Sequence, residues 1–226
     1  MPFKLSPSDF AYLYEECKLC YYLKVKHNIY QPSMPMPGVF SAINSRLQSL
    51  LIGKNLRTLS PHLPEALVEK QEGWVESKPV PDTNVFIKGK YDLLARRPDN
   101  SHLLIDLKIS QASEDKIDKY QTQLRAYQFA LENPAQGEPI NITKMGLIVM
   151  YPDTVAFKSG TALLDFPPKW LEILPDEDKF LAFARQVSDL LSQPMPQESS
   201  ACKWCQYRHL GDSLVHADLI TSNIPF

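Results

Sequence analysis

Four segments of the chain carry apolar residues three and four positions apart, the spacing that gives a helix one apolar face. They cover residues 6–24, 38–51, 113–132 and 176–191. The first starts with Ser6 and Pro7, residue types that are common at helix starts, and Asp9 stands at the acidic position of a capping box. We therefore expect one continuous helix from residue 6. In the second, a helix after the proline-rich loop at residues 31–38, the predicted apolar face consists of Phe40, Ile43, Leu47 and Leu50.

Strand signals begin near Leu67. Residues 67–77, 84–95 and 102–110 are rich in strand-favouring residues and are separated by Gly, Pro, Asp and Asn, which predicts an antiparallel meander. A further buried strand is predicted at residues 145–152, with residues 154–158 as its partner. This order of helices and strands predicts a single α/β domain, residues 1–226, with a mixed sheet.

Composition narrows the class of protein only slightly. A chain of 226 residues, 44% of them hydrophobic, can bury a core without disulfides. The N-terminal residues lack the basic start and apolar run of a signal peptide, and no apolar run is long enough to cross a bilayer, so we expect a cytoplasmic protein without membrane contact. The net charge of −2 neither indicates nor excludes nucleic-acid binding, because a local basic groove is enough to contact phosphates.

Two aspartates and a lysine stand in otherwise apolar strands on either side of a predicted turn. Asp92 and Asp106 each lie seven residues from Asp99, so symmetric pairing of the strands places them opposite each other. Lys108 follows Asp106 by two positions and shares its face of the strand. Such a set suits a hard divalent cation that holds a water beside a phosphodiester. The alternative is a surface hairpin with an ion pair worth at most about 1 kcal/mol, but the apolar neighbours favour burial.

A family resemblance rests on three motifs. The stretches "GKYDLL" (89–94) and "LLIDLK" (103–108), followed on the next helix by Gln123 and Tyr127 one turn apart, resemble in order and spacing the PD-(D/E)XK nuclease superfamily. The resemblance extends to its RecB-type branch, which includes the CRISPR-associated iron–sulfur exonuclease. It implies a restriction-endonuclease-like mixed sheet flanked by helices. It also implies that Asp92 and Asp106 bind Mg²⁺ or Mn²⁺, that Lys108 assists catalysis, and that Gln123 and Tyr127 support the site.

The metal site implied by the resemblance comprises Asp92, Asp106, Leu107 and the residue at position 44. Members commonly have a histidine at this last position, whereas this chain has Asn44, whose amide oxygen is a weaker ligand than imidazole or is simply solvated on a helix surface. The implied activity is hydrolysis of DNA, at single strands or ends, in repair, recombination or CRISPR adaptation. Because of Asn44, a subunit that binds DNA or a partner such as an integrase or helicase, with little cleavage, is the alternative.

A Cys-x-x-Cys pair stands near each end of the chain, and together the pairs form a complete four-thiolate metal site. The four residues are Cys17, Cys20, Cys202 and Cys205. In a cytosolic protein such pairs are more often metal ligands or redox groups than disulfides. Zinc, an iron–sulfur cluster and four unligated thiols are all compatible with the pattern, and a zinc-stabilised scaffold without catalysis is a third functional hypothesis.

The resembling nucleases hold a four-iron, four-sulfur (4Fe-4S) cluster with cysteines from both ends of the domain, usually one N-terminal and three C-terminal. Here Cys20 takes the place of the third C-terminal cysteine, and His209 is either a substitute ligand or an exposed residue. The resemblance therefore favours a 4Fe-4S cluster that joins residues 1–30 to residues 195–212, with structural Zn²⁺ as the alternative.

Basic and aromatic residues near these motifs predict a channel for single-stranded DNA, although each one singly also suits a surface or core position. The aromatic residues are Tyr21, Tyr22 and Trp204, and the basic residues are Lys24, Lys26, Arg46, Lys54, Arg57, Lys116, Lys119 and Arg125.

Overall fold

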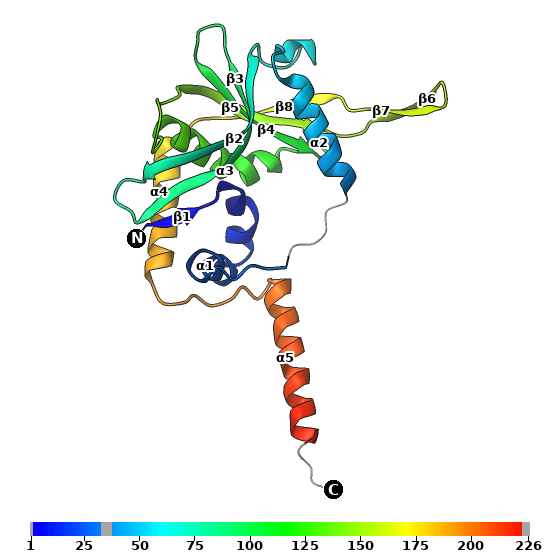
Figure 1. Ribbon diagram of the computed structural model, residues 1–226. Coiled ribbons are helices and arrows are strands. Elements are labelled where there is room, and N and C mark those ends of the chain that lie inside the picture. The colour runs from blue at the N-terminus through cyan, green and yellow to red at the C-terminus, as the bar shows by residue number, and fades with distance from the viewer. Residues whose placement is uncertain (1, 33–37, 223–226) are drawn as a thin grey trace.

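A computed structural model describes residues 2–32 and 38–222, with side chains described as far as residue 214. It shows a mixed six-stranded sheet with helices on both faces (Figure 1), which confirms the expected fold class. Most of the predicted proline-rich loop, residues 33–37, lies outside the described residues. Within the described ranges, no helix combines the length and the apolar character needed to cross a membrane.

The sheet runs in the order β1-β3-β4-β5-β8, with β2 paired to β3. Antiparallel pairing of β2, β3 and β4 confirms the expected meander, while β4 and β5 are parallel and β5 and β8 antiparallel. The strands are β1 (Phe3–Leu5), β2 (Leu67–Pro79), β3 (Val85–Arg96), β4 (His102–Ile109), β5 (Ile142–Met150) and β8 (Pro168–Ile173).

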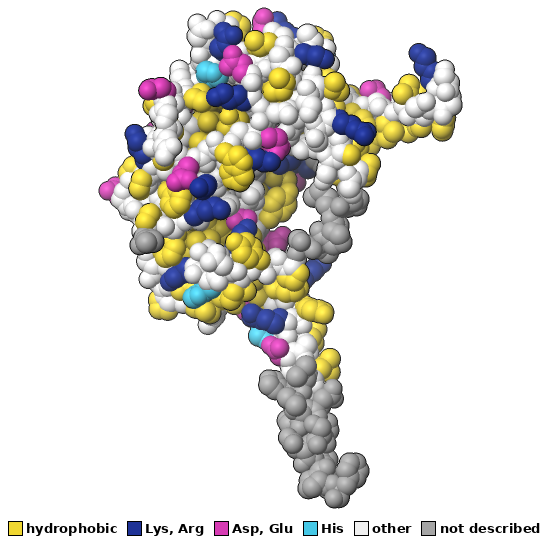
Figure 2. Space-filling view, in the orientation of Figure 1, with side chains coloured by type: hydrophobic (Ala, Val, Ile, Leu, Met, Phe, Trp, Pro, Cys, Tyr) yellow, Lys and Arg dark blue, Asp and Glu magenta, His cyan; other side chains and the backbone are white. Residues whose placement is uncertain are grey.

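A separate hairpin interrupts the chain between β5 and β8. Among the residues that the structure describes, its strands β6 (Thr154–Lys158) and β7 (Thr161–Asp165) pair only with each other, so the prediction that residues 154–158 pair with the preceding strand is wrong. Both edges of β5 are taken by β4 and β8. Ser159 and Gly160 both have positive φ, as a two-residue type I′ turn requires, and this turn brings β7 back onto β6. The hairpin projects from the body, lined by exposed hydrophobic side chains (Figures 1 and 2).

Helices cover the two faces of the sheet unequally. The helices are α1 (Lys18–His27), α2 (Gly38–Leu51), α3 (Asp115–Glu132), α4 (Glu177–Ser192) and α5 (Lys203–Ser222). On one face, α3 packs against the strands through the larger hydrophobic core, and α4 packs against α3. On the other face, α2 meets a smaller core built around Leu51, Leu103 and Ile148. From its start beside α1, α5 extends away from the body (Figure 1).

The first predicted helix is not continuous. A 3₁₀ turn (Pro7–Asp9) and a π-helical turn (Phe10–Tyr14) precede α1, and Cys17 has an extended backbone with φ −159° and ψ 113°. The Ser6 side chain makes no capping hydrogen bond. Asp9 forms an ion pair with Lys24 instead of a capping box, at 2.6 Å between Oδ1 and Nζ. The break lies where the chain enters the four-cysteine site, so a long-range contact overrides the local helix signal.

The predicted apolar face of α2 is right for Leu47, which packs on the smaller core, and wrong for Phe40 and Leu50. Phe40 and Leu50 are 44% and 62% exposed, whereas Gln48 and Leu51 are buried. The face toward the sheet runs through Asn44, Leu47, Gln48 and Leu51, because Leu47 and Leu51 pack onto the smaller core. This orientation brings Asn44 and Gln48 toward the sheet.

Candidate active site and four-cysteine site

The candidate active site lies where the sheet forks. Along one edge, β3 pairs with β2 over residues 86–96. On its other edge, β3 pairs with β1 only at residues 85–87 and with β4 only at residues 93–96. Residues 88–92 of β3 therefore lack a strand neighbour on that edge, and the Pro7–Asp9 turn packs against β3. Such a fork leaves room for side chains between the strands.

Asp92 is the first residue of β3 beyond the last β3–β4 pair. That pair joins Leu93 to Ile105, and its register confirms the symmetric hairpin about Asp99 that the sequence predicts. The strands separate beyond this pair, and Asp92 Oδ2 accepts a hydrogen bond from the Leu107 backbone N–H at 2.8 Å. Leu107 thus holds the Asp92 carboxylate through its backbone.

Asp106 is buried and is held by two side chains. Its Oδ1 accepts a hydrogen bond from Gln123 Nε2 at 3.0 Å, and its Oδ2 lies 2.6 Å from Lys108 Nζ. Gln123 reaches it from α3, which packs on this face of the sheet. The structure therefore brings Asp92, Asp106, Lys108 and Gln123 together.

Tyr127 takes a supporting position rather than contacting a carboxylate. Its hydroxyl donates a hydrogen bond at 2.8 Å to the backbone carbonyl of Lys90, in the unpaired stretch of β3. Gly89 allows this approach, because a Cβ there would lie 3.1 Å from the Tyr127 ring and 3.0 Å from Pro7 Cδ. Tyr127 thus ties α3 to β3 two residues before Asp92.

The ionisation of these groups reflects burial and mutual repulsion. Burial, together with the nearby Asp106 charge, raises the pKa of Asp92 to about 7. Burial also raises the pKa of Asp106, although Lys108 and Gln123 act in the opposite direction. For Lys108, burial works to lower the pKa, but the Asp106 carboxylate outweighs it and holds the pKa above its usual value. The ammonium is therefore charged at neutral pH, while Asp92 binds a proton readily.

The donor set fits a hard divalent cation. Among the described residues, Asn44 Oδ1 is buried without a hydrogen-bond partner, and Asp106 Oδ2 contacts only the Lys108 ammonium. Asn44 lines a pocket together with Leu107 and Lys108. Carboxylate and amide oxygens are ligands that Mg²⁺ and Mn²⁺ favour.

Several residues predicted for a DNA channel serve the fold instead. Tyr21 and Tyr22 are 0% and 5% exposed, so their faces are closed to bases. Lys26 donates hydrogen bonds to the Tyr22 hydroxyl and the Leu191 carbonyl, and the buried Arg125 donates to the Leu174 carbonyl. Lys24 is paired with Asp9.

Sequence reasoning missed two tyrosines beside Lys108. Tyr12 and Tyr120 join through their hydroxyl groups, and the Lys108 ammonium lies 4.5 Å from the centre of the Tyr120 ring. A signal for Tyr120 was present, because it precedes Gln123 by three residues and Tyr127 by seven on the same helix. Tyr12 had no comparable signal, since it comes from a distant part of the chain.

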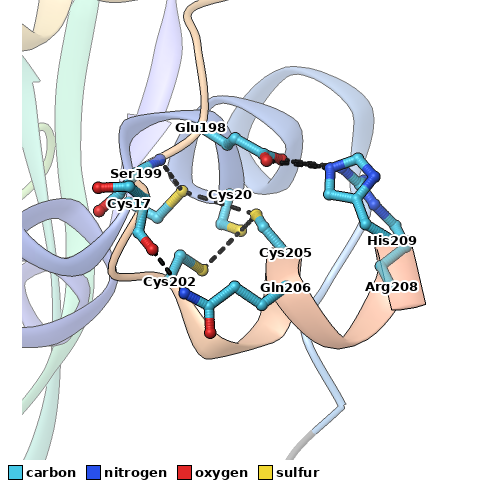
Figure 3. Close-up of polar contacts among 10 residues, drawn as sticks. Cys17, Cys20, Glu198, Ser199, Cys202, Cys205, Gln206, Arg208 and His209 are labelled. Carbon is cyan, nitrogen blue, oxygen red and sulfur yellow. Dashed lines mark hydrogen bonds and ion pairs between the residues drawn. The ribbon is translucent and has the colours of Figure 1, made fainter. Parts of the chain in front are cut away.

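The four cysteines gather into one buried cluster, although the two pairs are separated by more than 180 residues along the chain. All four sulfur atoms lie within 4.8 Å of one another (Figure 3). Cys20 Sγ is 3.5 Å from Cys205 Sγ and 3.9 Å from Cys202 Sγ, and Cys17 Sγ is 3.9 Å from Cys205 Sγ. Burial raises the pKa of Cys20 to about 11, so a bound cation is needed to hold the thiolate form. The cluster is a candidate metal site.

His209 lies beside the cluster but not in it. Its Nε2 contacts both carboxylate oxygens of Glu198, at 2.8 and 3.0 Å, and its side chain is 57% exposed (Figure 3). Cys17 Sγ accepts a hydrogen bond from the Ser199 backbone N–H at 3.5 Å. The residues around the cysteines thus provide the outer hydrogen bonds that metal sites commonly have.

Comparison with known proteins identifies the family and the fold of the chain. A family model for the PD-(D/E)XK nuclease superfamily matches residues 38–210, more than half of the chain. The solved structure described as the crystal structure of SSO0001 is similar, with a TM-score of 0.50 and 16% sequence identity over 85% of this chain and 78% of that chain. At this identity the likeness concerns the fold alone. None of the curated proteins compared with the sequence matches it. Because the family match covers more than half of the chain, the chain belongs to the PD-(D/E)XK nuclease superfamily.

Proposed function

We propose that this chain is a Mg²⁺- or Mn²⁺-dependent deoxyribonuclease of the RecB-type branch that cleaves single-stranded DNA or DNA ends. The supporting observation is the convergence of Asp92, Asp106 and Lys108 at the fork of the sheet, with Asp106 buried between Gln123 and Lys108. A divalent cation held there by Asp92, Asp106 and Asn44 would activate water and neutralise charge on the phosphate.

The side chains of the site have distinct roles in this proposal. Lys108, which stays protonated, stabilises the charge that develops on the phosphate oxygens. Gln123 holds one oxygen of Asp106 and so fixes the direction of the other. Tyr127 acts on β3 through the Lys90 carbonyl and is a positioning residue.

The decisive experiment compares cleavage of end-labelled single- and double-stranded DNA by wild type and Asp106→Asn, each with Mg²⁺ or Mn²⁺. We expect the substitution to lower cleavage at least about 100-fold without unfolding the chain. Asp189→Asn, at an exposed position of α4, is the matched control and should cleave like wild type. Full cleavage by Asp106→Asn would contradict the site assignment.

Asn44 supports a second candidate function, a subunit that binds DNA or a partner such as an integrase or helicase and cleaves little. In this second function the amide oxygen of Asn44, in place of the family's histidine, holds the cation too weakly for efficient cleavage. Asn44→His should then raise Mn²⁺ affinity and cleavage together. DNA binding without turnover, in wild type shown to hold its cation, would favour this second function over the nuclease.

We also propose that the four cysteines hold a single tetrahedral ion, zinc, rather than the 4Fe-4S cluster favoured by the resemblance. Zinc–sulfur bonds of about 2.3 Å place tetrahedral sulfurs about 3.8 Å apart. Three of the six sulfur separations, at 3.5, 3.9 and 3.9 Å, match this spacing, and the others do not exceed 4.8 Å. A 4Fe-4S cluster inserts a cube of iron and sulfide between its cysteines and holds them farther apart.

Metal analysis of anaerobically purified protein distinguishes the two centres. One zinc per chain and a colourless solution are the expected results. Four irons per chain, with the visible absorbance of an iron–sulfur cluster, would contradict the zinc proposal. Neither result affects the nuclease assignment, which rests on different residues.

A further inference from the structure

A pocket of about 460 Å³ opens beside the candidate active site. Its lining includes Tyr12, Phe40, Asn44, Lys108 and Tyr120. Its wall includes Lys108, so a ligand in the pocket lies next to the group that contacts Asp106. The volume is at the lower end of the range of about 300–1,000 Å³ for small-molecule sites, which suits one nucleotide rather than a base pair.

Aromatic side chains offer flat surfaces in this pocket. Tyr12 and Phe40 are each 44% exposed, whereas Tyr120 is buried. The Tyr12 and Tyr120 rings meet edge to face, with centroids 6.1 Å apart, and their hydroxyl groups form a hydrogen bond. This bond fixes the orientation of Tyr12, while the exposed Phe40 comes from α2 on the other face of the sheet. An exposed ring can stack on any base, because every base has a π-face.

Two ammonium groups lie close to the rings of Tyr12 and Tyr120. The Lys119 ammonium lies 4.0 Å from the centre of the Tyr12 ring, and the Lys108 ammonium lies 4.5 Å from that of Tyr120. Stacking surfaces and ammonium groups are the groups that bind a single nucleotide.

We propose that this pocket holds one unpaired nucleotide next to the cleaved phosphodiester. Its base packs against Phe40 and Tyr12, and the adjoining phosphate lies beside Lys108, which lines the pocket. A base within a duplex cannot enter without being unpaired and unstacked, which is energetically unfavourable. The pocket therefore selects single strands and frayed ends. This inference rests on the proposed nuclease function and names the substrate feature that the site recognises.

Binding measurements without cleavage test the pocket directly. The fluorescence anisotropy of a labelled single-stranded oligonucleotide gives the Kd in EDTA, for the intact strand and for strands with one abasic nucleotide at each position in turn. In wild type, we expect one abasic position to weaken binding roughly tenfold. In Phe40→Ala, the intact strand should bind about as weakly, and the abasic position should have no further effect.

The matched control is Phe157→Ala, which removes an 85% exposed aromatic side chain from the β6–β7 hairpin. It should bind both strands as wild type does. Equal binding of intact and abasic strands by wild type would overturn the proposal, as would an equal loss in Phe157→Ala.

These results distinguish failure of the pocket proposal from failure of the nuclease proposal. Tight binding with an abasic penalty but without cleavage in Mn²⁺ would contradict the nuclease function and leave the pocket in place. Cleavage of intact and abasic strands at the same rate, with no binding difference, would contradict the pocket alone.

Discussion

At the fork, individual side chains form hydrogen bonds with backbone groups that lie outside the regular strand pairing. Asp92 accepts the Leu107 N–H beyond the last β3–β4 pair, and Tyr127 donates to the Lys90 carbonyl in the unpaired stretch of β3. Buried backbone groups need such partners, because an unmet one costs about 1–3 kcal/mol. The same contacts hold the carboxylate of Asp92 in a defined place, so stability and site geometry depend on the same residues.

The raised pKa of Asp92 predicts a pH-dependent stability in metal-free protein. With a pKa of about 7 in the folded chain and near 3.8 when unfolded, Asp92 binds more protons in the folded state between these values. Protonated Asp92 therefore adds its full contribution to the free energy of unfolding below pH 4. This contribution is lost as pH rises through 7. Asp92→Asn should equal wild type in stability near pH 4 and exceed it at pH 8 by at least about 1 kcal/mol.

Thermal melting in EDTA across this pH range measures the difference. Added Mn²⁺ should stabilise wild type at pH 8 more than Asp92→Asn, since the cation replaces the proton between the carboxylates. A constant stability difference from pH 4 to pH 8 would show that Asp92 ionises normally.

Gln123 should matter for both folding and catalysis. Gln123→Leu leaves Asp106 Oδ1 buried without its donor, which we expect to lower the free energy of unfolding by about 1–3 kcal/mol. Cleavage should fall as well, because Asp106 loses its orientation. Urea unfolding measures the first effect. The control is Gln121→Leu on the same helix, where the amide contacts only Asp118 and the change should stay within about 0.5 kcal/mol.

At the scale of elements, β5 owes its position to close packing with β8. Gly146 pairs with Glu172, and a Cβ there would collide with the Leu171 carbonyl oxygen and the Trp170 ring. Because the carbonyl belongs to the backbone, it cannot move aside as a flexible side chain does. Gly146 thus fixes how closely these two strands approach.

Gly146→Ala should therefore destabilise the protein by at least about 1–3 kcal/mol, the usual cost of overpacking. Gly211→Ala in α5 is the control: nothing lies within 4 Å of its added Cβ, and replacing a helical glycine should stabilise by about 0.5–1 kcal/mol. Thermal melts of both variants provide the comparison. A melting temperature of Gly146→Ala equal to that of wild type would show that β8 moves to accept the methyl group.

At the scale of the whole molecule, the cysteines join segments from opposite ends of the chain. Cys17 and Cys20 flank the start of α1, while Cys202 and Cys205 flank the start of α5 (Figure 3). The cluster packs only a few further apolar side chains, including Leu19 and Trp204. The metal proposed to bind all four sulfurs would therefore contribute much of the attachment between these segments.

Removing that metal should loosen the C-terminal segment. Cys202→Ser, or chelation of wild type, should lower the free energy of unfolding by more than about 2 kcal/mol and expose residues 195–212 to protease. Chelation should add little in Cys202→Ser, because both changes remove the same ion. Ser200→Ala, an exposed neighbour, should melt like wild type. Unchanged stability after complete metal loss would show that packing alone holds the segments together.

The sequence by itself determined the features that depend on local spacing. The symmetric register of β3 and β4 about Asp99 follows from the turn and from the period of two along a strand. The order of the motifs indicated that Gln123 supports the site, where it contacts Asp106. The two Cys-x-x-Cys pairs indicated one shared site.

Only the tertiary structure decided what long-range packing controls. The break at Cys17, the partners of β5 and the orientation of α2 each override a local signal, because contacts with distant segments outweigh the small preference of a few residues. The same contacts bring Tyr12 to Tyr120 and Asn44 to Lys108, and so create the pocket beside the carboxylates. No spacing within one segment carries that information, since the residues that line the pocket meet only when the sheet and its helices are assembled.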